Sequence, residues 1–388
     1  MMPNHMEINI DITLCFLFYI LAEWTYRSGR ALSELKQAPT LKLSAPISRR
    51  GKVSVLIPAK NEEKNIADCV RPLLGQLRDS DEIIVINNYS EDRTEAVLQE
   101  LGASEILPDG SSANLKFRYL NTPQTPEGWT GKNFALHLGA QCASGDWLFF
   151  TDADTRHELG SIDAALTFAE KNTLALLTLL PRCITGSFWE DLIQPCAMGY
   201  MGLWFPIRKI NDPTSKTYFG NGQYLILEAG HYRTIGGHEG VKEAFLEDFA
   251  LMKKTKGSGA RGMCTFGMEI YGTRMYDSFK ALWRGWRRIF LHAYEQKPAL
   301  ILRRAFSVFF FSFLPLIILA TLPRHFSLSL LLSVLILAII FAAAFKAYAI
   351  VKAKKRYALL HPFAALAFTA ILLDAFRMAL FKRKTRWR

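Results

Sequence analysis

The sequence predicts an α/β protein built on an open, mostly parallel sheet, with apolar segments at both ends of the chain that are suited to a membrane. Between residues 53 and 155, short apolar runs alternate with helical stretches, which is typical of parallel strands joined by crossover helices. Half of the 388 residues are hydrophobic, and the longest apolar runs lie outside this alternating region.

The alternating region contains four predicted strands and three predicted helices. The strands are expected at 53–59, 82–86, 115–121 and 146–154, and the helices at 61–77, 91–102 and 131–144. Residues 174–230 are mixed in pattern and receive no assignment. Because ligands of open α/β sheets bind beyond the carboxyl ends of the strands, the polar residues that follow each strand form the candidate site.

The apolar runs lie at 8–24, 306–322, 326–351 and 357–381. Crossing a hydrocarbon layer of about 30 Å takes about 20 helical residues. A single run of this kind would be read as a buried core helix, but four runs around a polar middle favour membrane attachment. The first run lacks a preceding basic region and a good cleavage site, so we interpret it as a retained anchor.

The last run, 357–381, contains polar residues that are costly in lipid, among them Asp374 and Arg377. These two are three positions apart, so they can pair on a helix. The basic residues at 382–388 oppose a full crossing. This run is therefore expected either to pack its polar face on the other spans or, as we prefer, to lie along the membrane surface.

The net charge is +12, and the distribution of this charge predicts an orientation. Lys and Arg follow the first apolar run and none precedes it, so residues 25–305 are expected in the cytoplasm of a multi-pass protein of the cell membrane. The positive charge suits an anionic leaflet. No nucleic-acid motif is present, so nucleic acid is not expected as a partner. The six cysteines form no C-x-x-C pair and are expected to be free.

The segment TDADT (151–155) follows the strand that ends in Trp-Leu-Phe-Phe. Asp152 and Asp154 cannot both be buried unpaired, because each ionised group would carry a large desolvation cost. A divalent cation would neutralise both, and oxygen ligands suit Mg²⁺ or Mn²⁺. An isolated D-x-D is more often a solvated turn, but the place of this one at a strand end favours metal binding.

Two later segments leave alternatives open. In FLED (245–248), Asp248 is either a helix N-cap or a general base aimed at an acceptor hydroxyl. LWRGWRRIF (282–290) is compatible with an interfacial helix and with Arg and Trp side chains that hold a diphosphate and a sugar face.

These segments, in this order, resemble the family 2 glycosyltransferases with the GT-A fold. SVLIPAKNEE (54–63) is similar to the opening strand and nucleotide-contacting turn of the family, and EIIVINNYSEDRT to its Asp-Asp-x-Ser-x-Asp segment. TDAD is similar to the metal-binding D-x-D, FLED to the Glu-Asp base motif, and Arg284-Gly-Trp286 to the Arg-Trp element of membrane-bound members. PEGWTGKNFA (126–135) and FGNGQYLILEAGHYRTIGGH (219–238) resemble the subgroup that acts on carotenoid or hopanoid-type lipids.

The resemblance implies a nucleotide-diphospho-sugar transferase fold with helices on both faces of the sheet, and it implies roles for particular residues. The implied donor-binding residues are Pro58, Ala59, Glu62, Asn87, Lys132, Asp152, Arg284 and Trp286. Asp154 and Asp152 would hold Mg²⁺ or Mn²⁺, and Asp248 would be the base. Asn221, Gln223 and Glu247 would contact the sugar or the acceptor, although Asn221 and Gln223 fit a plain turn equally well.

Asn87 departs from the family, which usually has Asp at this position. An Asn side chain still accepts a hydrogen bond from a uracil N–H, but without charge. The implied reaction is inverting transfer from a nucleotide-sugar donor, with UDP preferred, to the hydroxyl or carboxyl of a membrane lipid. Two alternatives are a processive polysaccharide synthase and a catalytically degenerate lipid-binding homologue.

The expected organisation has three parts. Residues 1–26 form an N-terminal membrane anchor, residues 40–300 the cytoplasmic glycosyltransferase domain, and residues 301–388 a membrane region with two or three transmembrane helices.

Overall fold

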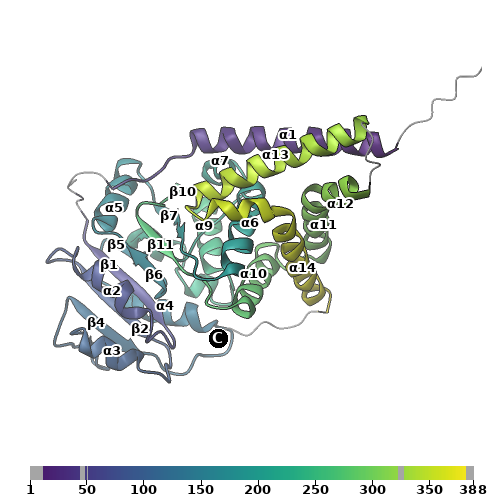
Figure 1. The fold of residues 1–388 in the computed structure, drawn as a ribbon. Helices are drawn as coiled ribbons and strands as arrows, with labels where there is room; N and C mark the ends of the chain where they lie inside the picture. Colours follow the sequence, from purple (N-terminus) through teal and green to yellow (C-terminus); the bar gives the residue numbers. More distant parts are fainter. Residues whose placement is uncertain (1–11, 44–48, 50, 322–326, 382–388) are drawn as a thin grey trace, which may run out of the picture.

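The computed structural model describes residues 12–43, 49, 51–321 and 327–381, and in this part of the chain a sheet of eight strands forms the centre (Figure 1). The strand order is β10-β7-β9-β5-β1-β2-β4-β3. Only β9 is antiparallel to its neighbours β5 and β7, so the predicted open, mostly parallel sheet is confirmed. The strands are β1 Val53–Ala59, β2 Glu82–Asn87, β3 Ser104–Glu105, β4 Phe117–Asn121, β5 Trp147–Phe150, β7 Leu176–Leu180, β9 Leu225–Glu228 and β10 Gly262–Phe266.

The four strands predicted from the alternating pattern are β1, β2, β4 and β5, which lie side by side in the sheet. The three predicted helices are present in shorter form, as α2 Ile66–Leu74, α3 Thr94–Glu100 and α4 Gly131–Gln141. The unassigned stretch 174–230 contains β7, β9 and the helices α6 Phe188–Trp204 and α7 Ile207–Asn211.

Three short strands form a second sheet, and the first of them, β6, follows β5 directly in the chain. Its order is β6-β11-β8, with β6 Thr155–His157, β11 Tyr271–Thr273 and β8 Arg182–Cys183. β6 follows the TDAD turn, so this small sheet holds the far end of the turn while β5 holds the near end.

Helices cover both faces of the main sheet, because alternate residues of each strand point to opposite faces. On one face, Val55 and Ile57 of β1 pack with α2, α3 and α5 Ser161–Lys171. On the other face, Leu56 packs with α4 and with α9 Glu247–Gly257. Both clusters are closed to solvent, so the sheet is a rigid base for the loops at its edges.

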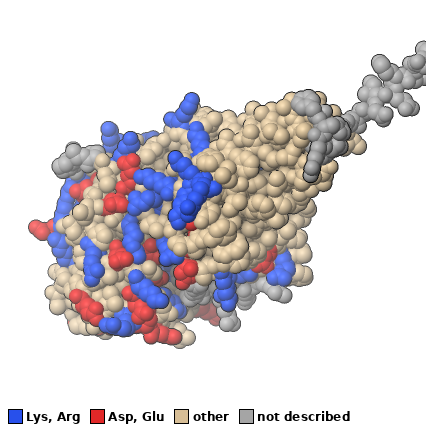
Figure 2. Space-filling view, in the orientation of Figure 1, with Lys and Arg blue, Asp and Glu red and all other residues tan. Residues whose placement is uncertain are grey.

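α8 Ala229–Thr234 and the turn Glu239–Val241 also pack on the face of the sheet that carries Leu56. The remaining helices form an apolar layer beside the sheet. They are α1 Ile12–Gln37, α10 Phe279–Ala293, α11 Pro298–Val308, α12 Leu314–Thr321, α13 Leu328–Ile350 and α14 His361–Leu380, with short turns at Phe309–Phe313 and Lys355–Leu360. α1 packs along α13, and α10, α11 and α14 pack together with α6. Figure 2 shows that Lys and Arg side chains gather over the sheet, whereas the side formed by α12 and α13 is largely uncharged.

Three helical segments within the described residues are long and apolar enough to cross a membrane: Pro298–Thr321, Leu328–Ile350 and Lys355–Leu380. They correspond to the three predicted C-terminal runs and indicate membrane association. α1 is not among these segments, and the anchor predicted at 8–24 begins outside the described residues.

The predicted pair Asp374–Arg377 is present on α14, with 2.9 Å between the charged atoms. Asp374 also accepts hydrogen bonds from Trp283 and Arg287 of α10, at 2.9 Å each. The polar face of α14 is therefore directed toward α10. The basic residues at 382–388 lie outside the described residues, so the preferred surface location of this segment stays a prediction.

Candidate active site

The carboxyl ends of β1, β2 and β5 meet at one edge of the sheet. Ala59, the last residue of β1, is paired with Asn87, the last residue of β2. Asn87 is 4% exposed, and its amide donates to Asn121 Oδ1 at 2.7 Å. Its own Oδ1 is buried and has no hydrogen-bond partner. Because a buried acceptor without a partner is costly, this oxygen is suited to accept a hydrogen bond from a ligand.

The loops after β1 and β2 are tied to each other by hydrogen bonds. Asn61 N–H donates to Ser90 Oγ at 2.9 Å, and Glu91 N–H donates to Asn61 Oδ1 at 2.8 Å. Asn61 and Tyr89 have positive φ angles of 58° and 53°, which is unusual for a bulky residue such as tyrosine and is found most often at functional sites. Glu62 lies in the first of these loops and Pro58 near the end of β1, so this region forms one wall of the site.

Lys132, at the start of α4, joins two carboxylates from distant parts of the chain. Its Nζ lies 2.8 Å from Asp152 Oδ1 and 2.7 Å from Glu247 Oε1. Burial alone would lower the pKa of Lys132, but the two carboxylates raise it overall. Lys132 is therefore held in its charged form between the TDAD turn and the start of α9.

Asp154 lies in the same cluster, where neighbouring groups neutralise only part of its negative charge. Burial, together with the charges of Asp152 and Glu62, raises the pKa of Asp154 to about 8. Its Oδ1 is buried and has no hydrogen-bond partner. The cluster thus contains more carboxylates than the single Lys132 can neutralise.

Asp248 is the second residue of α9, and Leu246 occupies the N-cap position. Its Oδ2 accepts the Gly222 N–H at 2.7 Å, and its Oδ1 accepts the Phe249 N–H at 2.8 Å. Burial and the neighbouring Glu247 raise the pKa of Asp248 to about 7. A carboxylate with a pKa near neutrality is suited to accept a proton, which favours the base over the N-cap interpretation.

The loop at 219–223 packs directly on Asp248. A Cβ at Gly220 would lie 2.3 Å from the Asp248 carbonyl oxygen, and a Cβ at Gly222 would lie 3.1 Å from Lys132 Nζ. Asn221 donates to Leu179 O and to Tyr271 Oη at 2.8 Å each, and Gln223 donates to Thr273 at 3.3 Å. The side chains of both residues are thus engaged with the protein, which agrees with the turn interpretation.

α10 places its arginines differently from the sequence-based expectation. Trp286 is 1% exposed and packs on Phe290 in the core with α14, so the predicted closure of this ring over a diphosphate does not fit its position. Arg284 is exposed to solvent. The packing of Trp286 in the core fixes the rotation of α10 about its axis. This contact joins residues far apart in the sequence, so the local sequence pattern could not predict it.

Arg288, one turn further along α10, is only partly exposed and faces the FLED segment. Its guanidinium lies 5.0 Å from the ring centroid of Phe245, the first residue of FLED. Burial raises the pKa of Tyr276, while Arg288 lowers it and Asp154 raises it. Both charges therefore act on this tyrosine hydroxyl. Sequence reasoning missed Arg288 and Tyr276, although Arg288 belongs to the basic run at 284–288.

The donor set suits a hard divalent cation. Asp154 has a buried oxygen without a partner, and carboxylate oxygens are ligands that Mg²⁺ and Mn²⁺ prefer. Within the described ranges, no group of three or more His, Cys, Asp or Glu side chains could hold a metal ion. Asp152 and Asp154 therefore fit a cation that takes its other ligands from a diphosphate and water, as Mg²⁺ often does.

Both the sequence and the fold are similar to those of known proteins. Residues 54–225 match the sequence model of glycosyl transferase family 2. The chain is 26% identical over 245 residues to the 4,4'-diaponeurosporenoate glycosyltransferase of Staphylococcus haemolyticus (strain JCSC1435), covering 61% of this chain and 60% of that protein. The enzyme of the same name from Staphylococcus aureus (strain MRSA252) is 24% identical over 242 residues, with the same coverage. The chain thus spans about 60% of the length of these curated relatives.

Among solved structures, the fold is similar to that of a mannosyltransferase from Pyrobaculum calidifontis in complex with GDP-Man and Mn²⁺. The TM-score is 0.52 at 17% identity, covering 96% of this chain and 100% of the other. Residues 54–225 thus match glycosyl transferase family 2, and the chain has a GT-A-like fold.

Proposed function

We propose that this protein is an inverting glycosyltransferase that moves a sugar from a nucleotide-diphosphate donor, a UDP-sugar, to the hydroxyl or carboxyl of a membrane lipid. The observation that carries the proposal is the cluster of Asp152, Asp154, Lys132 and Asp248 at the carboxyl edge of a family 2 domain. The named activity of the staphylococcal relatives and the three apolar helices support a lipid acceptor of the carotenoid, hopanoid or glycolipid type.

The donor would lie across the ends of β1, β2 and β5. The unpaired Oδ1 of Asn87 would accept the N–H of the nucleobase, with Pro58, Ala59 and Glu62 beside the nucleoside. Asp152 and Asp154 would hold Mg²⁺ or Mn²⁺, which neutralises charge on the leaving diphosphate. The Mn²⁺ in the Pyrobaculum structure belongs to a protein of similar fold and is consistent with this assignment.

Asp248 would take the proton from the acceptor oxygen as that oxygen bonds to the anomeric carbon. The bond from this carbon to the diphosphate oxygen breaks in the same displacement, and the nucleoside diphosphate leaves with the bonding electrons. Hydrogen bonds from the Gly222 and Phe249 N–H groups fix the orientation of the Asp248 carboxylate. Glu247, paired with Lys132, would position the sugar or the acceptor.

Arg288 is a better candidate than Arg284 for contact with the diphosphate. Arg288 acts on the same Tyr276 hydroxyl as Asp154, whereas Arg284 is exposed. An arginine near a diphosphate forms charge-assisted hydrogen bonds to the phosphate oxygens. We therefore assign this role to Arg288, with Trp286 as a core residue that sets the rotation of α10.

We also propose that the chain has three parts: an anchor at 1–26, a catalytic domain at 40–300 that faces the cytoplasm, and a multi-pass membrane region at 301–388.

The proposed activity is tested with purified protein, Mn²⁺, radiolabelled UDP-glucose and GDP-mannose, and a bacterial lipid extract as acceptor. One labelled sugar on a lipid supports it. A long labelled polymer would instead identify a processive synthase, and absence of any product with Asp248 intact would contradict the proposal.

A further inference from the structure

An apolar groove of about 500 Å³ lies between α1, α6 and α13, apart from the carboxylate cluster. We call it the α6 groove. Residues 195–205, in and just after α6, line one part of the groove, residues 339–351 of α13 and its end line a second, and the part of α1 from Trp24 to Ala38 and its end line a third. α1 runs alongside α13 (Figure 1). Its volume is within the range of about 300–1,000 Å³ that is common for ligand sites.

Small residues create the space between the helices. A Cβ added at Gly202 would meet no atom within 4 Å, and one at Gly199 would meet only Ala347 Cβ at 3.5 Å. Ala343 and Ala344 of α13 also line the groove. α6 and α13 contact each other elsewhere, as where Tyr348 Oη donates to Leu192 O at 2.7 Å, but at Gly202 they leave room for an apolar group.

The chemistry of the walls favours a hydrocarbon chain over water. Water in a cavity needs two to four polar partners, and the walls are mostly aliphatic and aromatic side chains. Two polar atoms of groove residues are nevertheless buried without partners, Ser28 Oγ and His361 Nδ1, and His361 is 6% exposed. The groove thus fits a long apolar molecule that also carries a hydrogen-bonding group.

The helices that form the groove and its position near Asp248 both favour the lipid acceptor as the molecule that the groove binds. The walls belong to α13, a candidate membrane span, and to α1, which packs along it. At the inner end, the Phe219 ring lies 4.8 Å from that of Phe249, the residue after Asp248. An aromatic contact therefore links the lining of the groove to the residue that follows the proposed base.

We propose that the α6 groove binds the hydrocarbon part of the lipid acceptor, an inference that rests on the proposed function. Lipid would enter from the bilayer between α1 and α13. The unpartnered atoms of Ser28 and His361 would receive a polar group along the chain, and the inner aromatic wall would hold the lipid beside the loop at 219–223.

The test fills the groove from one wall. Gly202→Leu places a side chain in the open space, and Gly257→Leu is the matched control, because Gly257 is also in a helix with no atom within 4 Å of an added Cβ. Binding of the fluorescent polyene parinaric acid is expected to weaken at least tenfold in Gly202→Leu and to stay unchanged in Gly257→Leu. The KM for the lipid acceptor is expected to rise at least tenfold, with the KM for the donor unchanged.

The outcomes separate the two proposals. Binding and acceptor KM both unchanged in Gly202→Leu would overturn the groove as a lipid site, and Ala343→Leu on α13 repeats the test should Gly202→Leu fail to fold. Weakened parinaric acid binding with an unchanged acceptor KM would overturn the acceptor assignment alone. Failure of the proposed function would appear differently, as an absence of sugar transfer by the wild type, while the binding measurement still decides whether the groove takes a hydrocarbon chain.

Discussion

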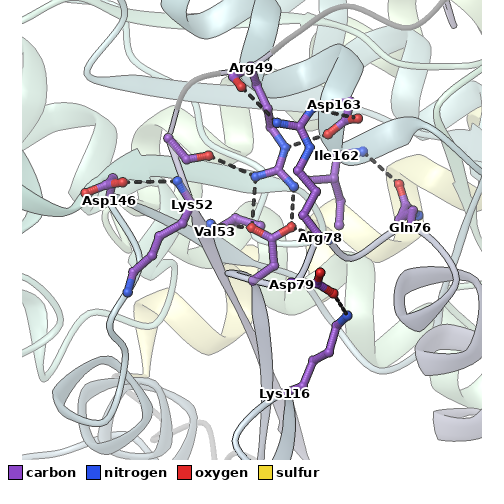
Figure 3. A network of polar contacts seen from close by, with 12 residues as sticks. Arg49, Lys52, Val53, Gln76, Arg78, Asp79, Lys116, Asp146, Ile162 and Asp163 are labelled. Atoms are coloured by element: carbon purple, nitrogen blue, oxygen red, sulfur yellow. Dashed lines mark hydrogen bonds and ion pairs between the residues drawn. The ribbon is translucent and has the colours of Figure 1, made fainter.

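Two clusters of charged side chains lie at opposite ends of the strands of the main sheet, and they differ in the balance of positive and negative groups. At the amino ends of β1 and β2, Arg49 contacts Asp81 and Asp163, and Arg78 contacts Asp163 at 3.2 Å (Figure 3). Two cations face two anions there. At the carboxyl ends, Lys132 faces Asp152, Asp154, Glu247 and Asp248.

The pKa directions follow this difference. Burial alone would raise the pKa of Asp81, but hydrogen bonds from Arg49, Arg78 N–H and Val53 N–H lower it overall. For Asp154 and Asp248 the compensation is incomplete. Lys132 lowers both pKa values, and the Gly222 and Phe249 N–H groups lower that of Asp248, but burial and the neighbouring carboxylates raise the two pKa values to about 8 and about 7 overall. A network in which the charges are paired stabilises the fold. An excess of carboxylates has a negative charge that a bound cation or a proton can neutralise. This difference is the reason why we propose the cluster at the carboxyl ends as the functional one.

The largest expected effect concerns the cluster at the carboxyl ends of the strands. Asp248→Asn removes the proposed base while keeping a similar shape, and losing a general base typically lowers kcat by about 10²- to 10⁴-fold. UDP binding should stay nearly intact. Single-turnover transfer measured beside UDP titration checks this, and a variant with full rate would show that Asp248 only holds Gly222.

The next largest effect is expected in the Arg49 cluster at the amino ends of β1 and β2. Arg49→Met leaves Asp81 buried and unpaired, which should destabilise the fold by about 3–5 kcal/mol. Arg93→Met, which breaks the exposed Arg93–Glu100 pair, is the control and should cost at most about 1 kcal/mol. Thermal melts of both variants make the comparison, and equal melting temperatures would refute a structural role for the Arg49 network.

A smaller effect distinguishes the arginines of α10. Arg288→Gln should lower kcat/KM for the donor by about 10- to 100-fold, since hydrogen bonds to charged groups contribute about 1.5–3 kcal/mol. Arg284→Gln, at an exposed position, should stay within about twofold of wild type. The reverse ranking would restore the assignment made from the sequence.

The smallest expected effect is the pH dependence. Asp248 must be deprotonated to act as a base, so kcat should fall as the pH drops below about 7 and reach a plateau above it. Glu247 and Lys132 face the same carboxylate, and removing the negative charge in Glu247→Gln should move the midpoint to lower pH. A pH–rate profile that is flat between pH 5 and 8 would contradict the assignment.

The sequence predicted which residues lie at the ends of the strands, but it did not predict which residues contact each other across the fold. The apolar runs and the D-x-D placed Asp152 and Asp154 correctly after β5, because both signals are local. β9 was not predicted, since its position between β5 and β7 depends on pairing with residues about 50–80 positions away. The choice between Arg284 and Arg288 likewise depends on how Trp286 packs against α14, which no local pattern encodes.

The central claim is that the unbalanced carboxylates at the carboxyl edge hold a nucleotide diphosphate through a divalent cation. Titration calorimetry with UDP, with Mn²⁺ and then with EDTA, tests it most directly. The account predicts binding by the wild type only when Mn²⁺ is present, and loss of that binding in Asp154→Ala but not in Arg49→Met at temperatures where it is folded. Equal UDP binding in Mn²⁺ and in EDTA, or unchanged binding by Asp154→Ala, would contradict it.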